Sequence, residues 1–132
     1  MTEQSAHIAL GLLKLNRLIN RIELNIPVAQ LEVLLLLAAH GAMNLSDLAR
    51  LRRVKMSTMS VMMEQMLTSR LVIRAHSKSD RRQRIYLITN LGKKQLHTAS
   101  QLMQGNLQGF LSRLTDEEQA TLQQVVDRLV DN

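Results

Sequence analysis

The chain has 132 residues, enough for one domain, and its 45% apolar and 21% charged residues are ordinary for a globular protein. It contains no cysteine, which excludes disulfides, cysteine-ligated zinc, iron–sulfur clusters and thiol redox chemistry. The longest unbroken apolar run, Val33 to Ala39, is far shorter than the roughly 20 residues of a membrane span. The N-terminus also lacks the features of a signal peptide, so we expect a cytoplasmic protein with no membrane contact.

The net charge of +6 is unevenly distributed along the chain. Ten basic residues lie between Arg50 and Arg84, where only Glu64 and Asp80 oppose them, so this segment carries +8. A solvated surface run would have a similar composition, but such a concentration favours a polyanionic partner, most commonly nucleic acid. Because the chain has no tryptophan, one tyrosine and one phenylalanine, stacking of single-stranded bases is disfavoured and a duplex is expected.

The first part of the chain predicts two helices separated by a proline. Between residues 5 and 26, isoleucines and leucines recur at steps of three and four, which forms one apolar stripe along a helix. Pro27 breaks this pattern and suits the first turn of a new helix. The nearly all-apolar segment from Val28 to His40 then predicts a helix through the core, which Gly41 is expected to cap.

Two further helices are predicted close together. Asn44 is an N-cap candidate for a short helix over Leu45–Arg52. An amphipathic helix is predicted from Met56 to about Ser69, with methionines on one side and polar residues on the other. We interpret the methionine side as the face that packs into the core, rather than as a soft binding surface. The residues that form this side include Met56, Met59, Met62, Met63 and Met66.

The periodicity then changes to that of strands. Leu71–Ile73 and Ile85–Ile88 are short and rich in β-branched or aromatic residues, which predicts a β-hairpin with a polar turn over His76–Arg81. A long helix is predicted from Asn90 to about Ser112. The segment Thr115–Glu118 begins the last helix, because it combines a cap residue, acids in the first turn and the spacing of a capping box.

A short helix, a tight turn, an amphipathic helix and a basic hairpin, in this order, form a winged helix-turn-helix. The sequence therefore predicts a mainly α fold in a single domain, residues 1–132, with the winged helix-turn-helix over residues 28–89. A DNA major groove about 12 Å wide accepts one α-helix, and a basic hairpin beside it reaches the minor groove. The helices at 5–26 and 90–131 carry more apolar surface than one small protomer can bury, so they are expected to form a dimerisation region.

Several short motifs also resemble those of the MarR family of bacterial transcriptional regulators, and the resemblance covers nearly the whole chain. Its most specific part is Asp-Arg-Arg seven residues before Thr-x-x-Gly. The motifs are Asn44-Leu45-Ser46-Asp47-Leu48-Ala49, Val54, Ser57-Thr58, Leu71-Val72, Asp80-Arg81-Arg82, and Thr89 with Gly92. The resemblance implies a dimeric repressor or activator that binds pseudo-palindromic double-stranded DNA through a winged helix. It also implies an effector between the dimer interface and the DNA-reading part, where Leu, Ile and Met would suit a small apolar molecule.

The resemblance also implies individual roles in DNA binding. Ser57, Thr58 and Ser60 match groove-facing hydroxyls at the start of the recognition helix. In the hairpin, Asp80 is expected to orient Arg82, whose neighbours at the tip hold phosphates. The residues that we predict to contact DNA are Arg53, Lys55, Ser57, Thr58, Ser60, Val61, Gln65, Arg74, Lys78, Asp80, Arg81 and Arg82.

The chain departs from the family pattern at four positions. Many members have arginine where this chain has Val61, aspartate where it has Lys55, and glycine where it has Arg53 and Arg70. The last two replacements put the corresponding glycine-type turns in question, because a positive φ is costly for arginine.

Without arginine at position 61, the recognition helix has no basic side chain on its outer face. Val61 would contact a thymine methyl, and Glu64 would either repel phosphate or accept a hydrogen bond from a cytosine amine. We therefore expect modest base discrimination and strong salt dependence, with a log–log slope of about −5 to −9 for roughly 6–10 neutralised phosphates. Besides the wing, the basic side chains expected to supply DNA affinity are Arg50, Arg52, Arg53 and Lys55.

Other functions have less support in the sequence. The four histidines lack metal-ligand spacing, so no metal or other cofactor is expected. No glycine-rich phosphate loop, nucleophile elbow or apolar carboxylate pair is present, and we predict no catalytic residues and no enzyme activity. The alternative function is that of a winged-helix protein-interaction module whose basic segment docks an acidic partner. A gel shift on random duplex at low salt would separate this alternative from a DNA-binding regulator.

Overall fold

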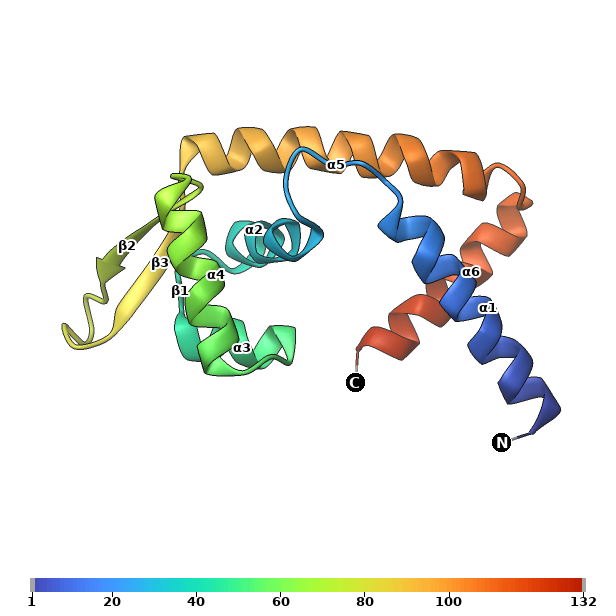
Figure 1. Cartoon of the computed structure of the whole chain (residues 1–132), viewed down its shortest axis with the longest axis horizontal. Helices are drawn as coiled ribbons and strands as arrows, with labels where there is room; N and C mark the ends of the chain where they lie inside the picture. Colours follow the sequence, from blue (N-terminus) through green and yellow to red (C-terminus); the bar gives the residue numbers. More distant parts are fainter. Residues whose placement is uncertain (1, 132) are drawn as a thin grey trace. The chain divides into compact units, whose positions relative to one another are not determined.

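The computed structural model describes residues 2–131, which form a mainly helical structure with one small antiparallel sheet (Figure 1). This confirms the predicted fold class. In chain order the elements are α1 (Glu3–Asn20), α2 (Val28–His40), β1 (Met43–Asn44), α3 (Leu45–Arg52), α4 (Met56–Thr68), β2 (Val72–His76), β3 (Arg84–Ile88), α5 (Asn90–Leu111) and α6 (Asp116–Val130).

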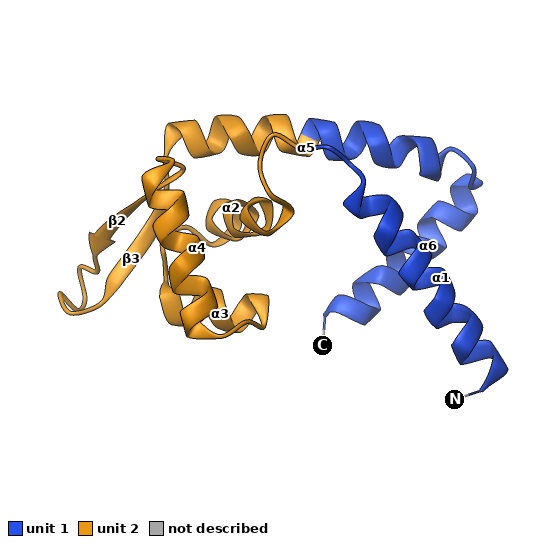
Figure 2. Cartoon of the chain, viewed as in Figure 1, with its two compact units in different colours: residues 1–23, 101–132 blue, residues 24–100 orange. Residues whose placement is uncertain are grey.

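The chain divides into two compact units, which Figure 2 shows in different colours. Residues 24–100 form one unit, here called the central unit. Residues 1–23 and 101–132 form the other, here called the terminal unit. The central unit contains all three strands together with α2, α3, α4 and the first part of α5.

The central unit is built around one apolar core. Helix α2 contributes Val33, Leu34 and Leu37, and helix α4 contributes three methionines that are fully buried. These methionines are Met59, Met63 and Met66. The interpretation of the methionine side as a core face is therefore confirmed for these residues. It is wrong for Met56, which is 49% exposed because the first turn of α4 extends beyond the core.

The sheet has three strands in the order β1-β3-β2, not only the predicted hairpin. Met43 of β1 pairs with Tyr86, and Arg74 of β2 lies opposite the same tyrosine. Sequence periodicity missed β1 because a two-residue strand has no detectable alternation. The predicted start of β2 at Leu71 is also wrong, because the Leu71 amide donates to the Met66 carbonyl oxygen (3.0 Å) and so completes the turn after α4.

The two turns that carry arginine in place of glycine keep the left-handed backbone. Arg53 has φ 55° and Arg70 has φ 63°. In each turn the next amide donates to a carbonyl five residues earlier, as in a Schellman motif: Val54 to Ala49 and Leu71 to Met66, both at 3.0 Å. These hydrogen bonds hold a conformation that costs an L-residue on the order of 1–2 kcal/mol.

Helix α1 ends at Asn20, six residues before the predicted end at Ile26. The periodic pattern continues, but the last part of it belongs to a different unit. Asn25 donates through Nδ2 to the carbonyl oxygen of Gln95 (3.0 Å) and to its Oε1 (2.6 Å), and Ile26 packs against the core of the central unit. Tertiary contacts therefore override the helical periodicity here.

The Thr-x-x-Gly motif fastens the start of α5 to the turn after α4. The Thr89 hydroxyl donates to the Arg70 carbonyl oxygen (2.7 Å) and accepts from the Gly92 amide (2.9 Å). A Cβ at position 92 would overlap the Leu71 carbonyl oxygen. The glycine is thus required for close approach of the two backbones.

The terminal unit has regular helices but buries little. The predicted capping box at Thr115 is confirmed, with Glu118 N donating to Thr115 Oγ1 (3.1 Å) and Thr115 N donating to Glu118 Oε1 (3.0 Å). Neither α1 nor α6, as far as the structure describes them, has a buried residue. Within residues 2–131, no helix combines the length and the apolar character needed to cross a membrane.

Candidate nucleic-acid interface

Helix α4 presents a polar, solvent-exposed face opposite its buried methionines. This face begins at the first turn of the helix with Ser57 and Thr58 and continues through Ser60 and Gln65. Val61 lies in the middle and is 61% exposed, although it is apolar. One shallow depression runs along this face and is lined by Ser60, Val61, Glu64, Gln65, Thr68 and Ser69. The predicted base-reading residues of α4 therefore share one accessible surface.

The β2–β3 hairpin forms a wing whose tip, residues 77–83, is ordered by its own polar groups. The Ser77 amide donates to the Gln83 carbonyl oxygen (2.8 Å), and Asp80 Oδ1 accepts from the Arg82 amide (3.0 Å). Asp80 thus acts on the backbone of Arg82. The carboxylate and guanidinium of these two described residues form no ion pair. Four predicted contact residues at this tip are exposed: Lys78, Asp80, Arg81 and Arg82.

A groove of about 370 Å³ separates α4 from the wing, and we call it the helix–wing groove. Ser60 and Glu64 of α4 form one wall, and Arg74, which projects from β2, forms part of the other. The remaining residues that line it are Asn44, Leu45, Ser46, Gln83, Arg84 and Tyr86. The groove therefore joins the exposed face of α4 and the base of the wing in one surface.

Glu64 and Arg74 form an ion pair across this groove. Arg74 Nη1 lies 3.0 Å from Glu64 Oε1, and the side chains of Arg74 and Glu64 are 34% and 61% exposed, respectively. Hydrogen bonds with Tyr86 and with Glu64 raise the pKa of Arg74 above its usual value, so the guanidinium remains charged. Arg74, a predicted DNA contact, is thus engaged by the one acidic residue of α4.

The basic side chains of α3 and of the turn that follows it differ in their exposure to solvent. Arg53 and Lys55 are exposed, and Arg50 lies 3.3 Å from Asp47 on the surface of α3. Arg52 is different, because its side chain is only 12% exposed and lies 3.0 Å from Glu32 of α2. Arg52 is expected from the sequence to supply DNA affinity, but in the structure its guanidinium is largely covered and holds α3 against α2.

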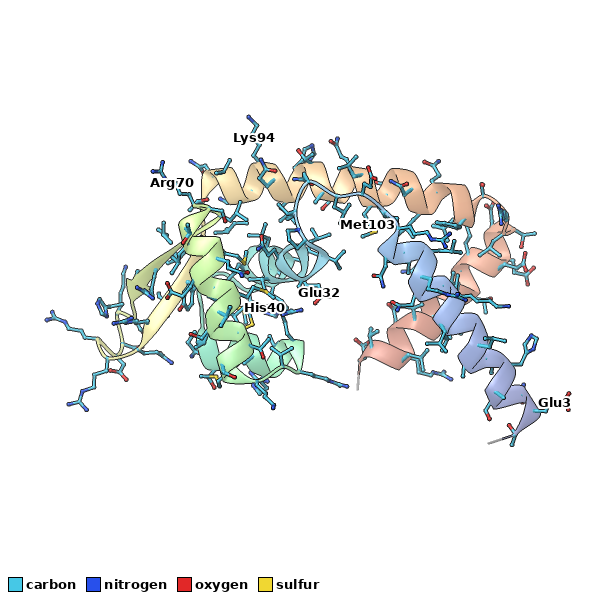
Figure 3. All side chains as sticks on the ribbon, in the orientation of Figure 1. Glu3, Glu32, His40, Arg70, Lys94 and Met103 are labelled. Atoms are coloured by element: carbon cyan, nitrogen blue, oxygen red, sulfur yellow. The ribbon has the colours of Figure 1, made fainter. Side chains whose placement is uncertain are left out.

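Sequence reasoning did not select Ser46, Gln83 or Arg84 as contact residues, although all three line the helix–wing groove. Strand alternation could have identified Arg84, because it is two residues from Tyr86 and so shares its face. Arg70, with its side chain at the end of α4, lies close to the start of α5 (Figure 3). Among residues 2–131, no three His, Asp or Glu side chains gather as metal ligands would.

The central unit matches a known protein family. The model that describes the MarR family matches residues 26–83, from the residue before Pro27 to the tip of the wing. Among curated protein sequences, none matches this chain.

Solved structures resemble the chain over nearly its full length. YusO from Bacillus subtilis is 25% identical, with 99% of each chain covered and a TM-score of 0.71. A mutant MarR from E. coli in complex with operator DNA is 23% identical, with 95% of this chain and 91% of that chain covered and a TM-score of 0.76. BpsR from Bordetella bronchiseptica, whose DNA binding is regulated by 6-hydroxynicotinic acid, is 19% identical, with 96% and 98% covered and a TM-score of 0.77.

Proposed function

We propose, on the premise that this chain belongs to the MarR family, that it is a sequence-specific regulator that binds double-stranded DNA as a homodimer and represses transcription. Members of this family are transcriptional regulators and not enzymes. The observation that carries the proposal is the helix–wing groove, because it places the exposed face of α4 beside a basic wing. A duplex offers the matching pair of surfaces, a major groove for one helix and a phosphate backbone beside it.

In the proposed complex each part of this surface has its own task. Ser57, Thr58 and Gln65 hydrogen-bond to base edges, and Val61 contacts a thymine methyl group. Arg82 enters the minor groove from the wing. The cations that neutralise phosphates are Arg53, Lys55, Lys78 and Arg81, and the ordered tip of the wing supports the last two.

The homodimer is supported by the terminal unit. Leu13 of α1 is 61% exposed, and Leu129 and Val130 of α6 are each 67% exposed. Contiguous apolar faces of this kind are covered in soluble proteins, and in a two-fold dimer each protomer covers the same patch of the other. A dimer also presents two copies of α4 to a pseudo-palindromic site, with successive major grooves about 34 Å apart.

Two further features complete the proposal. A small apolar effector modulates DNA binding, and its support is the regulation of BpsR by 6-hydroxynicotinic acid. The regulator acts on the bacterial chromosome, which places it in the cytoplasm.

The test measures binding to duplex DNA over a range of salt concentrations. Fluorescence anisotropy with a random duplex should show log affinity falling against log salt with a slope of about −5 to −9. A flat salt dependence would remove the phosphate contacts from the mechanism. If no duplex is bound even at low salt, the protein-interaction module becomes the better function.

Two variants that each remove one positive charge test whether the wing contacts DNA. Arg82→Ala should lower affinity for an A·T-flanked site about tenfold or more, because a minor-groove arginine contributes to both shape readout and charge. Lys94→Ala removes the same charge from α5, on the side facing away from the rest of the central unit (Figure 3), and should change affinity less than twofold or so. Equal effects of the two variants would contradict a role for the wing.

A further inference from the structure

We propose that Glu64 is the specificity-determining residue of the α4 face, that it selects cytosine, and that Arg74 positions its carboxylate. This inference rests on the proposed function and deepens it. The observation behind it is the ion pair at 3.0 Å between Arg74 Nη1 and Glu64 Oε1 across the helix–wing groove.

Glu64 lies within the surface that would meet a major groove. It lines the depression on the exposed face of α4 together with Val61 and Gln65, and it also lines the helix–wing groove. Its side chain is 61% exposed. A duplex that contacts Val61 and the wing therefore also meets this carboxylate.

Because Glu64 is charged, placing it against DNA without a hydrogen-bond donor costs binding free energy. Helix α4 contains no lysine or arginine, so Glu64 is its one charged residue. Repulsion from phosphates is screened over about 8–10 Å in physiological salt, but a carboxylate facing a base edge without a donor also loses its hydration. DNA sequences that offer a donor at this point are therefore favoured over those that do not.

Base chemistry then identifies the favoured base. In the major groove, guanine and thymine present carbonyl oxygens, which repel a carboxylate. Cytosine and adenine present an amine, but adenine adds the N7 acceptor beside it. Cytosine is the base whose major-groove hydrogen-bonding group is a donor alone, so it matches a carboxylate best.

Arg74 leaves the carboxylate free to accept such a donor. The guanidinium binds Oε1, while Oε2 accepts no hydrogen bond from any residue of the described part of the chain. Arg74 lies opposite Tyr86, a buried residue of β3, in the register of the sheet, so one end of the pair is anchored to the sheet. It thus fixes one oxygen, offsets part of the negative charge and leaves the second oxygen toward solvent.

The experiment selects bound duplexes from a randomised library with the full chain and sequences them. The wild-type protein should enrich cytosine over guanine at one position of each half-site. Glu64→Gln should reduce this cytosine-to-guanine ratio about tenfold, since an amide also donates to a carbonyl oxygen. The same variant should bind random duplex no more weakly than wild type, because it has lost a negative charge. Glu64→Asp keeps the charge but shortens the reach, and should also reduce the ratio.

Arg74 variants test the positioning role with the same readout. Arg74→Ala should lower the cytosine-to-guanine ratio at that position, and Arg74→Lys should restore part of it. Glu23→Gln removes one negative charge outside α4 and the wing and should leave all base ratios unchanged. Thermal unfolding followed by circular dichroism establishes that each variant is folded.

The outcomes separate the two levels of the proposal. If Glu64→Gln leaves the base ratios unchanged at every position, Glu64 contributes only charge and the inference is overturned, while sequence-specific binding stands. The inference is likewise overturned if wild type enriches no cytosine. If wild type binds no duplex at all, the proposed function itself fails.

Discussion

The two units of this chain differ in where their apolar side chains lie. All the buried apolar residues that the structure describes, from Leu31 to Ala99, belong to the central unit. In the terminal unit, α1 and α6 have comparable apolar stripes, but those side chains remain exposed. The central unit thus buries an apolar core within one protomer, whereas the apolar stripes of the terminal unit stay exposed and, in our proposal, are covered by a second protomer.

The glycines of helix α5 show the same contrast between tightly packed and exposed positions. Near its start, Gly92 approaches the Leu71 carbonyl oxygen so closely that no Cβ atom fits there. Farther along, the position that a Cβ would occupy at Gly105 and Gly109 has no atom within 4 Å apart from those of the adjacent helix backbone and chain neighbours. The first glycine is fixed by packing within the chain, and the other two are constrained by nothing in one protomer.

Breaking the terminal unit's proposed interface should give the largest effect. Leu129→Glu places a charge in the apolar face of α6, and the two-fold symmetry places it there twice. We expect the dimer dissociation constant to rise on the order of a thousandfold, since burial of unpaired charge costs several kcal/mol. Sedimentation at micromolar concentration measures this as a shift from dimer to monomer.

The matched control introduces the same charge in the central unit. Ile73 of β2 is 53% exposed, and Ile73→Glu should leave the oligomeric state unchanged. If the wild-type protein sediments as a monomer, the terminal unit does not form the proposed dimer interface.

Replacing glycine by alanine at a packed and at an exposed position of α5 compares the two units directly. Gly92→Ala should lower the free energy of unfolding by about 1–3 kcal/mol, because the new methyl group overlaps the Leu71 carbonyl oxygen. Gly105→Ala should raise it by about 0.5–1 kcal/mol, because alanine favours a helix interior. Urea unfolding at equal protein concentration checks both values. Destabilisation by Gly105→Ala would indicate that a partner surface contacts this position.

An effect as small as that of Gly105→Ala is expected at the left-handed turn after α4. Arg70→Gly removes the strain of φ 63° but makes the unfolded chain more flexible, so we expect a net gain of about 0.5–1 kcal/mol. Ser69→Gly is the neighbouring control: Ser69 has φ −82°, so glycine relieves nothing there and stability should fall. Urea unfolding of the two variants with opposite signs would support the strain, and equal signs would contradict it.

Local rules were sufficient for several features of the fold. The bounds of α2 and α3 are those predicted, and the Gly41 and Asn44 caps are confirmed by φ 78° and by the 2.7 Å bond from Asp47 N to Asn44 Oδ1. Each of these features depends on residues at most a few positions apart. For the same reason the exposed face of α4 could be derived, since it follows from the helical period alone.

Features that depend on distant residues could not be obtained in this way. The end of α1 at Asn20 reflects a contact between Asn25 and Gln95, far apart in the sequence. The engagement of Arg52 by Glu32 and of Arg74 by Glu64 likewise joins separate elements. A count of basic residues cannot tell which cations are free to meet a phosphate.

By itself, the amino-acid order determined most helices and their caps, the positive segment and the motifs that resemble those of the MarR family, because short-range periodicity and composition encode them. Only the tertiary structure decided which arginines already have a carboxylate partner, that the arginine turns keep a positive φ, and that the apolar faces of α1 and α6 stay exposed in one protomer. The physical reason is that ion pairing and burial depend on distances through space, which a one-dimensional pattern does not contain.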